Sequence, residues 1–248
     1  EPQHTPVARK TAQSLQAGET FKRTDSAAQR AERDTSGEVI IMYRRYIKRL
    51  IDIILSFCGL AVLAVPMAVL AVIVKLDSQG PVLFWQKRVG IHKSTFMMPK
   101  FRTMYTDTPA NMPTHMLNDP ERWITRSGRW MRKLSMDELP QIWCILTNKM
   151  SVIGPRPALW NQYDLMAERD KYGANDVLPG LTGWAQINGR DELPISVKAA
   201  YDGEYVKNMS FVFDCRCFFG TIACVLKKEG VVEGGTGTLE KQAKEEAK

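Results

Sequence analysis

The hydrophobic pattern of this chain is dominated by an uncharged run of 22 apolar or small residues, Ile53–Val74. The hydrocarbon core of a membrane is about 30 Å thick and takes about 20 apolar residues to cross as a helix, so the run is just long enough. Pro66 lies past its middle, where a proline removes a helical hydrogen bond and favours a kink. The pattern therefore predicts a membrane-inserted helix that bends or breaks at Pro66.

Basic residues lie on both sides of the run: Arg44, Arg45, Lys48 and Arg49 before it, and Lys75, Lys87 and Arg88 after it. Lys and Arg mark the cytoplasmic end of a membrane segment, so a straight span would place one cluster on the wrong side. A helix that turns back at Pro66 enters and leaves through the same face. We therefore expect a re-entrant element over residues 42–80, with an ordinary span as the alternative.

The polar and apolar patterns outside this element divide the rest of the chain. Residues 1–41 are nearly free of large apolar side chains, so we expect a disordered leader or a remnant of expression or processing. Residues 81–232 are expected to form one cytosolic domain and residues 233–248 a flexible tail. The domain pattern predicts a mainly α fold with a few short strands.

Within the domain, a short strand is expected over residues 81–90 and loops over 151–157 and 179–190. Helices are expected over residues 137–150, 158–172, 195–208 and 211–228. The last of these helices is apolar over most of its surface, but Asp214 and Arg216 interrupt it. It fits an interfacial helix in the headgroup plane and equally a buried core helix.

Composition narrows the class of partner. The chain carries a net charge of +7 and has a pI near 9.2, which suits nucleic acid, anionic lipid or a phosphorylated substrate. The apolar run favours the last two over nucleic acid. The five cysteines are odd in number and irregularly spaced, which indicates reduced thiols. Cys215 and Cys217 have no histidine nearby, so buried small side chains are favoured over a metal site.

Asp137 and Glu138 are the strongest catalytic candidates. Pro140 is tolerated only in the first turn of a helix, so we expect the N-cap at Asp137 or later, unless the helix is kinked. A helix start favours an ionised carboxylate, and Arg132 and Lys133 push in the same direction. An ionised aspartate can attack phosphorus while a neighbouring glutamate holds a divalent cation. The same pair also fits an ordinary N-cap and first-turn acid, and the pattern leaves both interpretations open.

Several cations are candidates for phosphate binding. Arg156 lies between two prolines in the 151–157 loop, whose stiff backbone would hold the guanidinium fork ready for phosphate. An arginine that caps a neighbouring helix is the alternative. The glycine-rich 179–190 loop and Arg190 can cradle a nucleotide phosphate but match no dinucleotide or P-loop pattern. For Lys100 and Arg102, a solvated charge is the simpler interpretation.

Six motifs stand in a fixed order along the chain: KRLID (48–52), KFRTM (100–104), RKLSMDELPQ (132–141), SVIGPRP (151–157), PGLTGWAQINGR (179–190) and YVKNMSF (205–211). Together, over about residues 44–232, they resemble the monotopic phosphoglycosyl transferases of the bacterial sugar transferase family. Each motif alone is a weak signal, but six in the family's order are highly specific. The chain resembles the minimal catalytic unit of that family.

The resemblance implies an enzyme that moves a phospho-sugar from a UDP-sugar to polyprenol phosphate and releases UMP. It implies the first membrane step of glycoconjugate assembly, at the cytoplasmic face of the bacterial inner membrane. The implied fold is a re-entrant membrane helix with amphipathic interfacial helices around a small cytosolic catalytic domain. The implied partners are the two substrates and membrane lipids, with no nucleic acid.

The resemblance also implies roles for individual residues. Asp137 matches the family's nucleophile, which forms a covalent phosphoaspartyl intermediate, and Glu138 matches the glutamate that supports Mg²⁺. The other matched residues are Arg132 and Arg156 as phosphate ligands, Lys100 and Asp214 in the polar network, and Arg190 as a nucleotide contact. The family breaks its re-entrant helix at a Ser-Pro pair, whereas this chain has Val65-Pro66.

Two other functions account for part of the pattern. The same substrates could react by direct transfer, with Asp137 as a base or metal ligand. A non-enzymatic adaptor that binds anionic lipid would explain the net charge and the apolar run, but not the grouping of the motifs. No residue in the sequence decides which UDP-sugar is used.

Overall fold

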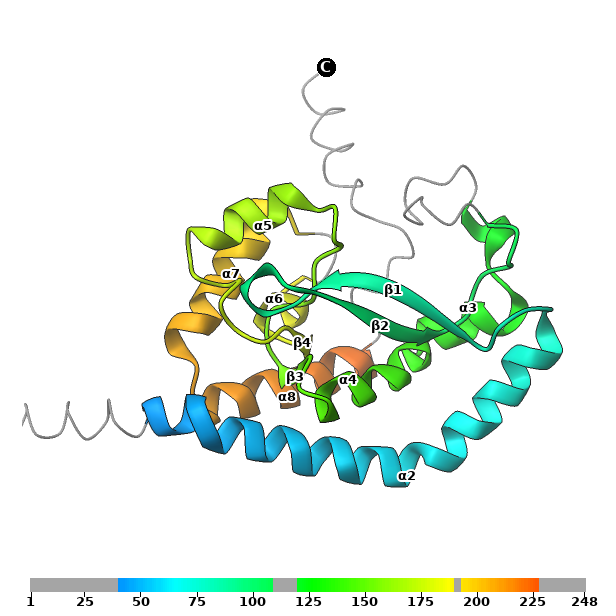
Figure 1. Cartoon of the computed structure of the whole chain (residues 1–248), viewed down its shortest axis with the longest axis horizontal. Coiled ribbons are helices and arrows are strands. Elements are labelled where there is room, and N and C mark those ends of the chain that lie inside the picture. Colours follow the sequence, from blue (N-terminus) through cyan, green and yellow to red (C-terminus); the bar gives the residue numbers. More distant parts are fainter. Residues whose placement is uncertain (1–39, 109–119, 190–192, 228–248) are drawn as a thin grey trace, which may run out of the picture. The chain divides into compact units, whose positions relative to one another are not determined.

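The computed structural model describes residues 40–108, 120–189 and 193–227. The chain divides into two compact units, Glu1–Ile47 and Lys48–Lys248. In the first unit, the described residues 40–47 are helical and include the π-helical turn η1, Tyr43–Ile47. All other elements lie in the second unit (Figure 1).

The second unit is mainly helical with a few short strands, which confirms the predicted fold class. Its elements in chain order are α2 (Lys48–Asp77), β1 (Leu83–Val89), η2 (Ile91–Lys93), β2 (Thr95–Phe101), η4 (Pro120–Trp123), α3 (Arg126–Lys133), η5 (Met136–Gln141), α4 (Ile142–Leu146), β3 (Ser151–Ile153), α5 (Tyr163–Asp170), β4 (Gly180–Thr182), α6 (Trp184–Ile187), α7 (Ile195–Asn208) and α8 (Phe211–Lys227).

The helices predicted over 195–208 and 211–228 are confirmed as α7 and α8, and the strand predicted over 81–90 as β1. The single helix predicted over residues 137–150 is wrong, because the segment forms the 3₁₀ helix η5 and then the short helix α4. Pro140 lies inside η5 and cannot donate a backbone hydrogen bond, which prevents one continuous α-helix. The segment 179–190, expected as a loop, contains β4 and α6.

Helix α2 contains the predicted apolar run and continues through Pro66 as one helix. Its ribbon changes direction in the second half, so the expected break is a bend within a continuous helix (Figure 1). Among the described residues, Ile40–Asp77 is the one helix long and apolar enough to cross a membrane, and only 11% of its most apolar window is buried. Exposed apolar side chains at this density suit lipid and are unfavourable in water.

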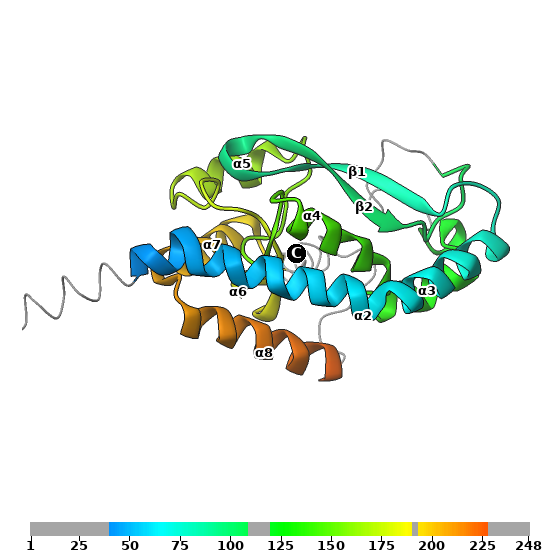
Figure 2. The same ribbon diagram turned by 60° about the horizontal axis from the view of Figure 1, so that its bottom comes forward.

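Helix α8 has two distinct faces. Its buried residues include Asp214 and Cys217, whereas the opposite face exposes five large apolar side chains: Phe211, Val212, Phe218, Phe219 and Ile222. Helix α8 runs beside the first half of α2 in both views (Figures 1 and 2). This amphipathic pattern agrees with an interfacial helix and excludes the alternative of a fully buried core helix.

The β1–β2 hairpin positions the segment that leads to the site. The two strands pair in an antiparallel register that runs from Leu83 opposite Phe101 to Val89 opposite Thr95. Strand β2 packs against η5. A core cluster of Leu70, Val74, Phe101 and Met131 then joins the second half of α2 to β2 and α3. The end of the long helix is thereby packed directly on the elements that carry the candidate residues.

Three glycines bring two of the sequence motifs together backbone to backbone. Strands β3 and β4 pair in parallel, and the Gly154 N–H donates to the Thr182 carbonyl at 2.8 Å. A side chain on Gly180 or Gly183 would overlap the backbone of Gly154. Close packing of the 151–157 and 179–190 segments therefore explains these glycines without a phosphate cradle.

We expect Gly180→Ala to destabilise the protein by about 1–3 kcal/mol, because the added methyl group forces the two backbones apart. The measurement is the thermal unfolding midpoint in detergent micelles. Gly59→Ala is the matched control, since its new methyl group would lie 3.8 Å from Ile142, in ordinary contact. Equal midpoints for the two variants would contradict this account of the packing.

Candidate active site

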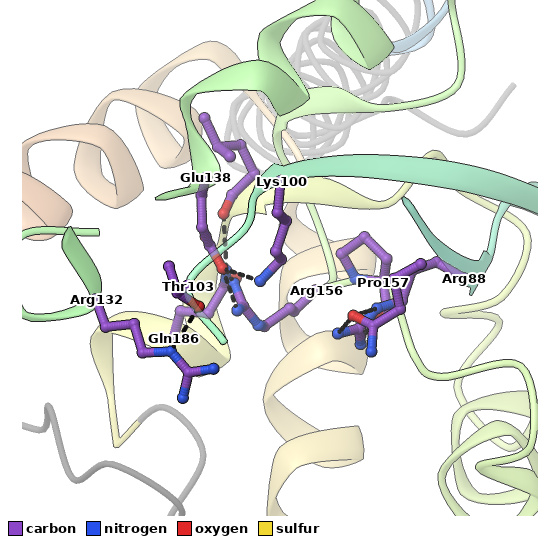
Figure 3. Close-up of polar contacts among 10 residues, drawn as sticks. Arg88, Lys100, Thr103, Arg132, Glu138, Arg156, Pro157 and Gln186 are labelled. Carbon is purple, nitrogen blue, oxygen red and sulfur yellow. Dashed lines mark hydrogen bonds and ion pairs between the residues drawn. The ribbon is translucent and has the colours of Figure 1, made fainter. Parts of the chain in front are cut away.

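The site is organised around the carboxylate of Glu138. Lys100 Nζ lies 2.7 Å from Glu138 Oε1, and Arg156 Nη2 lies at the same distance from the same oxygen (Figure 3). Arg156 Nη1 also donates to Oε2 at 3.3 Å. Lys100 comes from β2, Glu138 from η5 and Arg156 from the loop after β3. Three segments far apart in sequence therefore meet at one carboxylate.

Glu138 is ionised in this arrangement. Burial opposes its charge, but the charges and hydrogen bonds of Arg156 and Lys100 outweigh burial and hold the pKa of Glu138 well below its usual range. The side chain is 17% exposed, so solvent screens these contacts only in part. Glu138 therefore fixes two cations beside its neighbour, Asp137.

Asp137 is the second residue of η5 and is 9% exposed. Burial raises the pKa of Asp137, against the opposing charges of Lys100 and Arg132 and with a further rise from Glu138. The sequence-based expectation was the reverse, that the helix start and nearby cations would favour the ionised form. The structure differs because withdrawal of this carboxyl from water outweighs the attraction of the cations.

The predicted N-cap at Asp137 or later is also wrong, because the N-cap is Ser135. Helix η5 begins at Met136, and Ser135 precedes it with a left-handed backbone (φ 54°) that turns the chain out of α3. Asp137 is therefore not the N-cap, which removes the simplest structural role considered for it. Its carboxyl is instead buried next to the ion pairs of Glu138.

Arg132 approaches Asp137 from the last turn of α3. Its Nε donates to the Thr103 hydroxyl at 2.9 Å (Figure 3), and its charge opposes the rise that burial causes in the pKa of Asp137. Thr103 belongs to the KFRTM motif and is buried, but no sequence pattern distinguishes it as a site residue. Three of the predicted residues, Lys100, Arg132 and Glu138, thus act electrostatically on Asp137, and Arg156 joins the group through Glu138.

Arg102 does not join this group, and the expectation of a solvated charge is wrong for it. The residue is 6% exposed. Its Nε donates to the Pro81 carbonyl at 2.6 Å and its Nη2 to the Ser78 carbonyl at 2.8 Å. Arg102 therefore fixes the turn that follows α2 to the end of β2, because only a buried arginine fork can reach both carbonyls.

Asp214 belongs to a second polar cluster. Its carboxylate accepts from Lys48 Nζ at 2.6 Å and from the Tyr205 hydroxyl at 2.8 Å. The Tyr205 hydroxyl also lies 3.1 Å from the carbonyl of Ile153. These contacts place Asp214 where α2, α7 and α8 meet, rather than against the Glu138 carboxylate. Arg190 lies outside the described residues.

The KRLID motif anchors α2, a role that sequence reasoning missed. Besides the Lys48–Asp214 pair, Arg49 donates to the carbonyls of Ile145 and Leu146, and Asp52 accepts from the Val152 N–H at 2.9 Å. Basic residues beside an apolar run indicate membrane topology, but the charges of Lys48 and Arg49 make contacts inside the protein. In the sequence, only the place of KRLID as the first of the six family motifs indicates that these residues have a role.

A carboxylate of this site could contribute a ligand to a cation whose other ligands come from a substrate. Among the described residues, no group of three or more His, Cys, Asp or Glu side chains could hold a metal ion. Mg²⁺ commonly binds through one or two carboxylates together with substrate phosphates. Asp137 and Glu138 provide that number of carboxylates, and Arg132, Lys100 and Arg156 provide positive charge for phosphate oxygens.

The family described as Bacterial sugar transferase matches residues 43–228 of the chain. The uncharacterized sugar transferase EpsL of Bacillus subtilis is 37% identical over 195 residues, which cover 79% of this chain and 95% of EpsL. The UDP-glucose:undecaprenyl-phosphate glucose-1-phosphate transferase of Escherichia coli is 37% identical, over 72% of this chain and 40% of that protein.

A third relative is the UDP-N-acetylgalactosamine-undecaprenyl-phosphate N-acetylgalactosaminephosphotransferase of Aeromonas hydrophila. It is 35% identical, over 73% of this chain and 44% of that protein. The chain therefore spans nearly all of EpsL but less than half of the two larger relatives. The matched region includes every candidate site residue.

Proposed function

The chain belongs to the bacterial sugar transferase family, and we propose that it transfers a sugar-1-phosphate from a UDP-sugar to a polyprenol phosphate such as undecaprenyl phosphate. Two relatives are named for transfers of this kind, one of glucose-1-phosphate and one of an N-acetylgalactosamine phosphate. The observation that carries the proposal is the buried Asp137 carboxyl beside Glu138, which is itself held by Lys100 and Arg156.

In the proposed reaction, a carboxylate oxygen of Asp137 attacks the phosphorus that bears the sugar. The bond from this phosphorus to the bridging diphosphate oxygen breaks, and UMP leaves with the electron pair. An oxygen of polyprenol phosphate then attacks the phosphorus of the phosphoaspartyl group. The aspartyl oxygen leaves, which restores Asp137 and yields a polyprenyl diphosphate sugar.

Each neighbour of Asp137 has a role in this scheme. Arg132 and Arg156 bind phosphate oxygens of the substrate, and Lys100 helps to neutralise charge that develops on the leaving diphosphate oxygen. Burial of Asp137 keeps water away from the covalent intermediate, which limits its hydrolysis. Glu138 would hold Mg²⁺, which supplies charge neutralisation of the diphosphate when bound.

We further propose that residues 42–80 form a re-entrant element at the cytoplasmic face of the membrane and that residues 81–232 form the catalytic domain. The exposed apolar faces of α2 and α8 support insertion and interfacial binding, respectively. The Lys48, Arg49 and Asp52 contacts tie α2 to the catalytic domain. This attachment would hold Asp137 at the depth of the lipid phosphate.

The proposed topology predicts labelling on one side of the membrane. In a background without the five native cysteines, Ser36→Cys and Gln79→Cys should both react with an impermeant maleimide on the same side of sealed vesicles. The exposed residue Glu121, changed to cysteine, marks the side of the catalytic domain. Labels on opposite sides would instead establish an ordinary transmembrane span.

The direct test of the activity is a screen for UMP release across UDP-glucose, UDP-galactose and their N-acetylated amino forms, with undecaprenyl phosphate in detergent micelles. We expect UMP release with at least one of these donors. Binding to anionic liposomes without UMP release from any donor would support the adaptor function. Parallel double-reciprocal plots would favour the covalent route, and intersecting plots the direct transfer.

A further inference from the structure

The loop that carries Arg156 is held by two other arginines through consecutive carbonyl groups. Arg169 Nη2 donates to the carbonyl oxygen of Arg156 at 3.0 Å. Arg88 Nη1 donates to the carbonyl oxygen of Pro157 at 2.9 Å (Figure 3). Arg169 comes from α5 and Arg88 from β1, so hydrogen bonds from two separate elements hold the loop.

The carbonyl is the only backbone group through which the peptide between Arg156 and Pro157 can be anchored by a hydrogen bond. Proline has no N–H, so the opposite edge of this peptide cannot donate. The flanking prolines restrict φ at positions 155 and 157, but the orientation of this peptide also depends on ψ of Arg156. A donor aimed at the Arg156 carbonyl therefore fixes a rotation that the prolines alone leave open.

Arg169 is itself fixed by a buried ion pair with Asp202. The two side chains are 5% and 2% exposed, and the shortest distance between Arg169 Nη2 and Asp202 Oδ2 is 2.6 Å. Arg169 Nε also donates to the same oxygen at 2.8 Å. A buried ion pair is weak evidence for stability, because the cost of removing both charges from water offsets their attraction. The ion pair with Asp202 instead orients Arg169, so that its guanidinium points at the Arg156 carbonyl.

We propose that Arg169, held by Asp202, is a positioning residue that directs the guanidinium of Arg156 toward Glu138, with Arg88 as a second anchor on the same loop. Arg169 acts through the backbone of Arg156 and not on the substrate. The inference rests on the proposed transferase function for its effect on activity, but the backbone contact itself can be tested without turnover.

The principal variant is the double substitution Arg169→Met/Asp202→Leu, which removes both buried charges and avoids leaving one unpaired. Arg169→Lys is the milder variant, because lysine keeps the charge opposite Asp202 but lacks the fork that reaches two acceptors. Arg129→Met is the matched control, since the Arg129 side chain is 51% exposed and lies on α3, away from the loop.

The first readout is hydrogen–deuterium exchange of the full-length protein without substrate. Both Arg169 variants should show faster amide exchange in peptides that cover residues 151–160, with unchanged exchange in α3 and in the β1–β2 hairpin. The Arg129→Met protein should match the wild type throughout. Unchanged exchange at residues 151–160 in both Arg169 variants would overturn the proposal, as would a uniform increase over all peptides.

The second readout is a double-mutant cycle on kcat/KM for UMP release. The double substitution should lower kcat/KM about 10- to 100-fold when Arg156 is present, because a misplaced phosphate ligand costs about this much. In an Arg156→Met background the same change should cost less than about twofold. An equal loss in both backgrounds would show that Arg169 acts independently of Arg156 and would overturn the proposal.

The two readouts separate failure of this inference from failure of the proposed function. If the wild-type protein releases no UMP from any donor, the transferase function fails, and the exchange measurement still decides whether Arg169 and Asp202 hold the loop. If UMP is released and the local exchange does not change, the function stands and the positioning role falls.

Discussion

Asp137→Asn is expected to lower the rate of UMP release about 10⁴-fold or more, because asparagine has no charged oxygen with which to attack phosphorus. Intact mass spectrometry should detect a phospho-sugar adduct on the wild-type protein after incubation with the donor alone. The adduct should be absent from the variant. Full UMP release by Asp137→Asn would contradict the nucleophilic role.

The same substitution is expected to raise the unfolding midpoint near neutral pH. Burial raises the pKa of Asp137 despite the charges of Lys100 and Arg132. A carboxyl with a higher pKa in the folded state stabilises the fold below its unfolded-state pKa, and it loses that contribution as the pH rises through the folded-state pKa. Asparagine removes the resulting cost of ionisation at neutral pH.

The stability effect is tested by measuring the unfolding midpoints of both proteins over a range of pH. The gain in unfolding midpoint of Asp137→Asn over the wild type should shrink as the pH falls through the raised pKa, because the wild-type carboxyl becomes neutral. In the same range, kcat/KM of the wild type should fall, since the nucleophile is then protonated. A destabilised Asp137→Asn protein at neutral pH would show that the carboxylate is held by favourable contacts that outweigh burial.

Glu138→Gln is expected to reduce activity about 10²- to 10³-fold and, unlike Asp137→Asn, to destabilise the protein by about 1.5–3 kcal/mol. The pKa of Glu138 is held well below its usual range against burial, chiefly by Arg156 and Lys100. A depressed folded-state pKa contributes stability above the unfolded-state pKa, and that stability is lost as the pH falls through the folded-state value. Glutamine cannot ionise, so the variant lacks this stability at every pH.

Stability of the Glu138 variant should be measured with EDTA, so that metal binding does not add to the difference. Glu121→Gln is the matched control, because the Glu121 side chain is 64% exposed and its carboxylate lies 4.0 Å from Arg129 Nε. The proposed metal role adds a separate expectation, that Glu138→Gln requires more Mg²⁺ for half-maximal activity. An unchanged Mg²⁺ requirement with an equal unfolding midpoint would remove Glu138 from both roles.

We therefore expect the two neighbouring carboxyl groups to have opposite effects on stability, although both are expected to be essential for turnover. Sequence reasoning treated them alike, as acids at a helix start among cations. The difference arises because Glu138 meets Lys100 and Arg156 directly, whereas Asp137 is withdrawn from water with weaker compensation. Such a distinction depends on which side chain each cation reaches, and chain order does not specify this.

Some of the structure could be predicted because it depends on local or strictly periodic signals. The apolar run Ile53–Val74 is evident from composition alone, and the helices over 195–208 and 211–228 follow from segments with no internal proline. The segment 137–150 could not be assigned correctly, because it forms a 3₁₀ helix that contains Pro140 and then a separate short helix. The helix type of each part of this segment depends on how η5 packs against β2.

The sequence by itself determined the family, the mainly α fold class, the long apolar helix and the identity of the residues that gather near Asp137. These follow from composition, periodicity and the order of motifs, none of which requires knowledge of distant contacts. Only the tertiary structure decided that Lys100 and Arg156 share Glu138, that Asp214 pairs with Lys48 instead, and that Arg169 holds the Arg156 loop. The physical reason is that buried charges are partnered by whichever group the packing brings within hydrogen-bond distance, and these partners come from segments far apart along the chain.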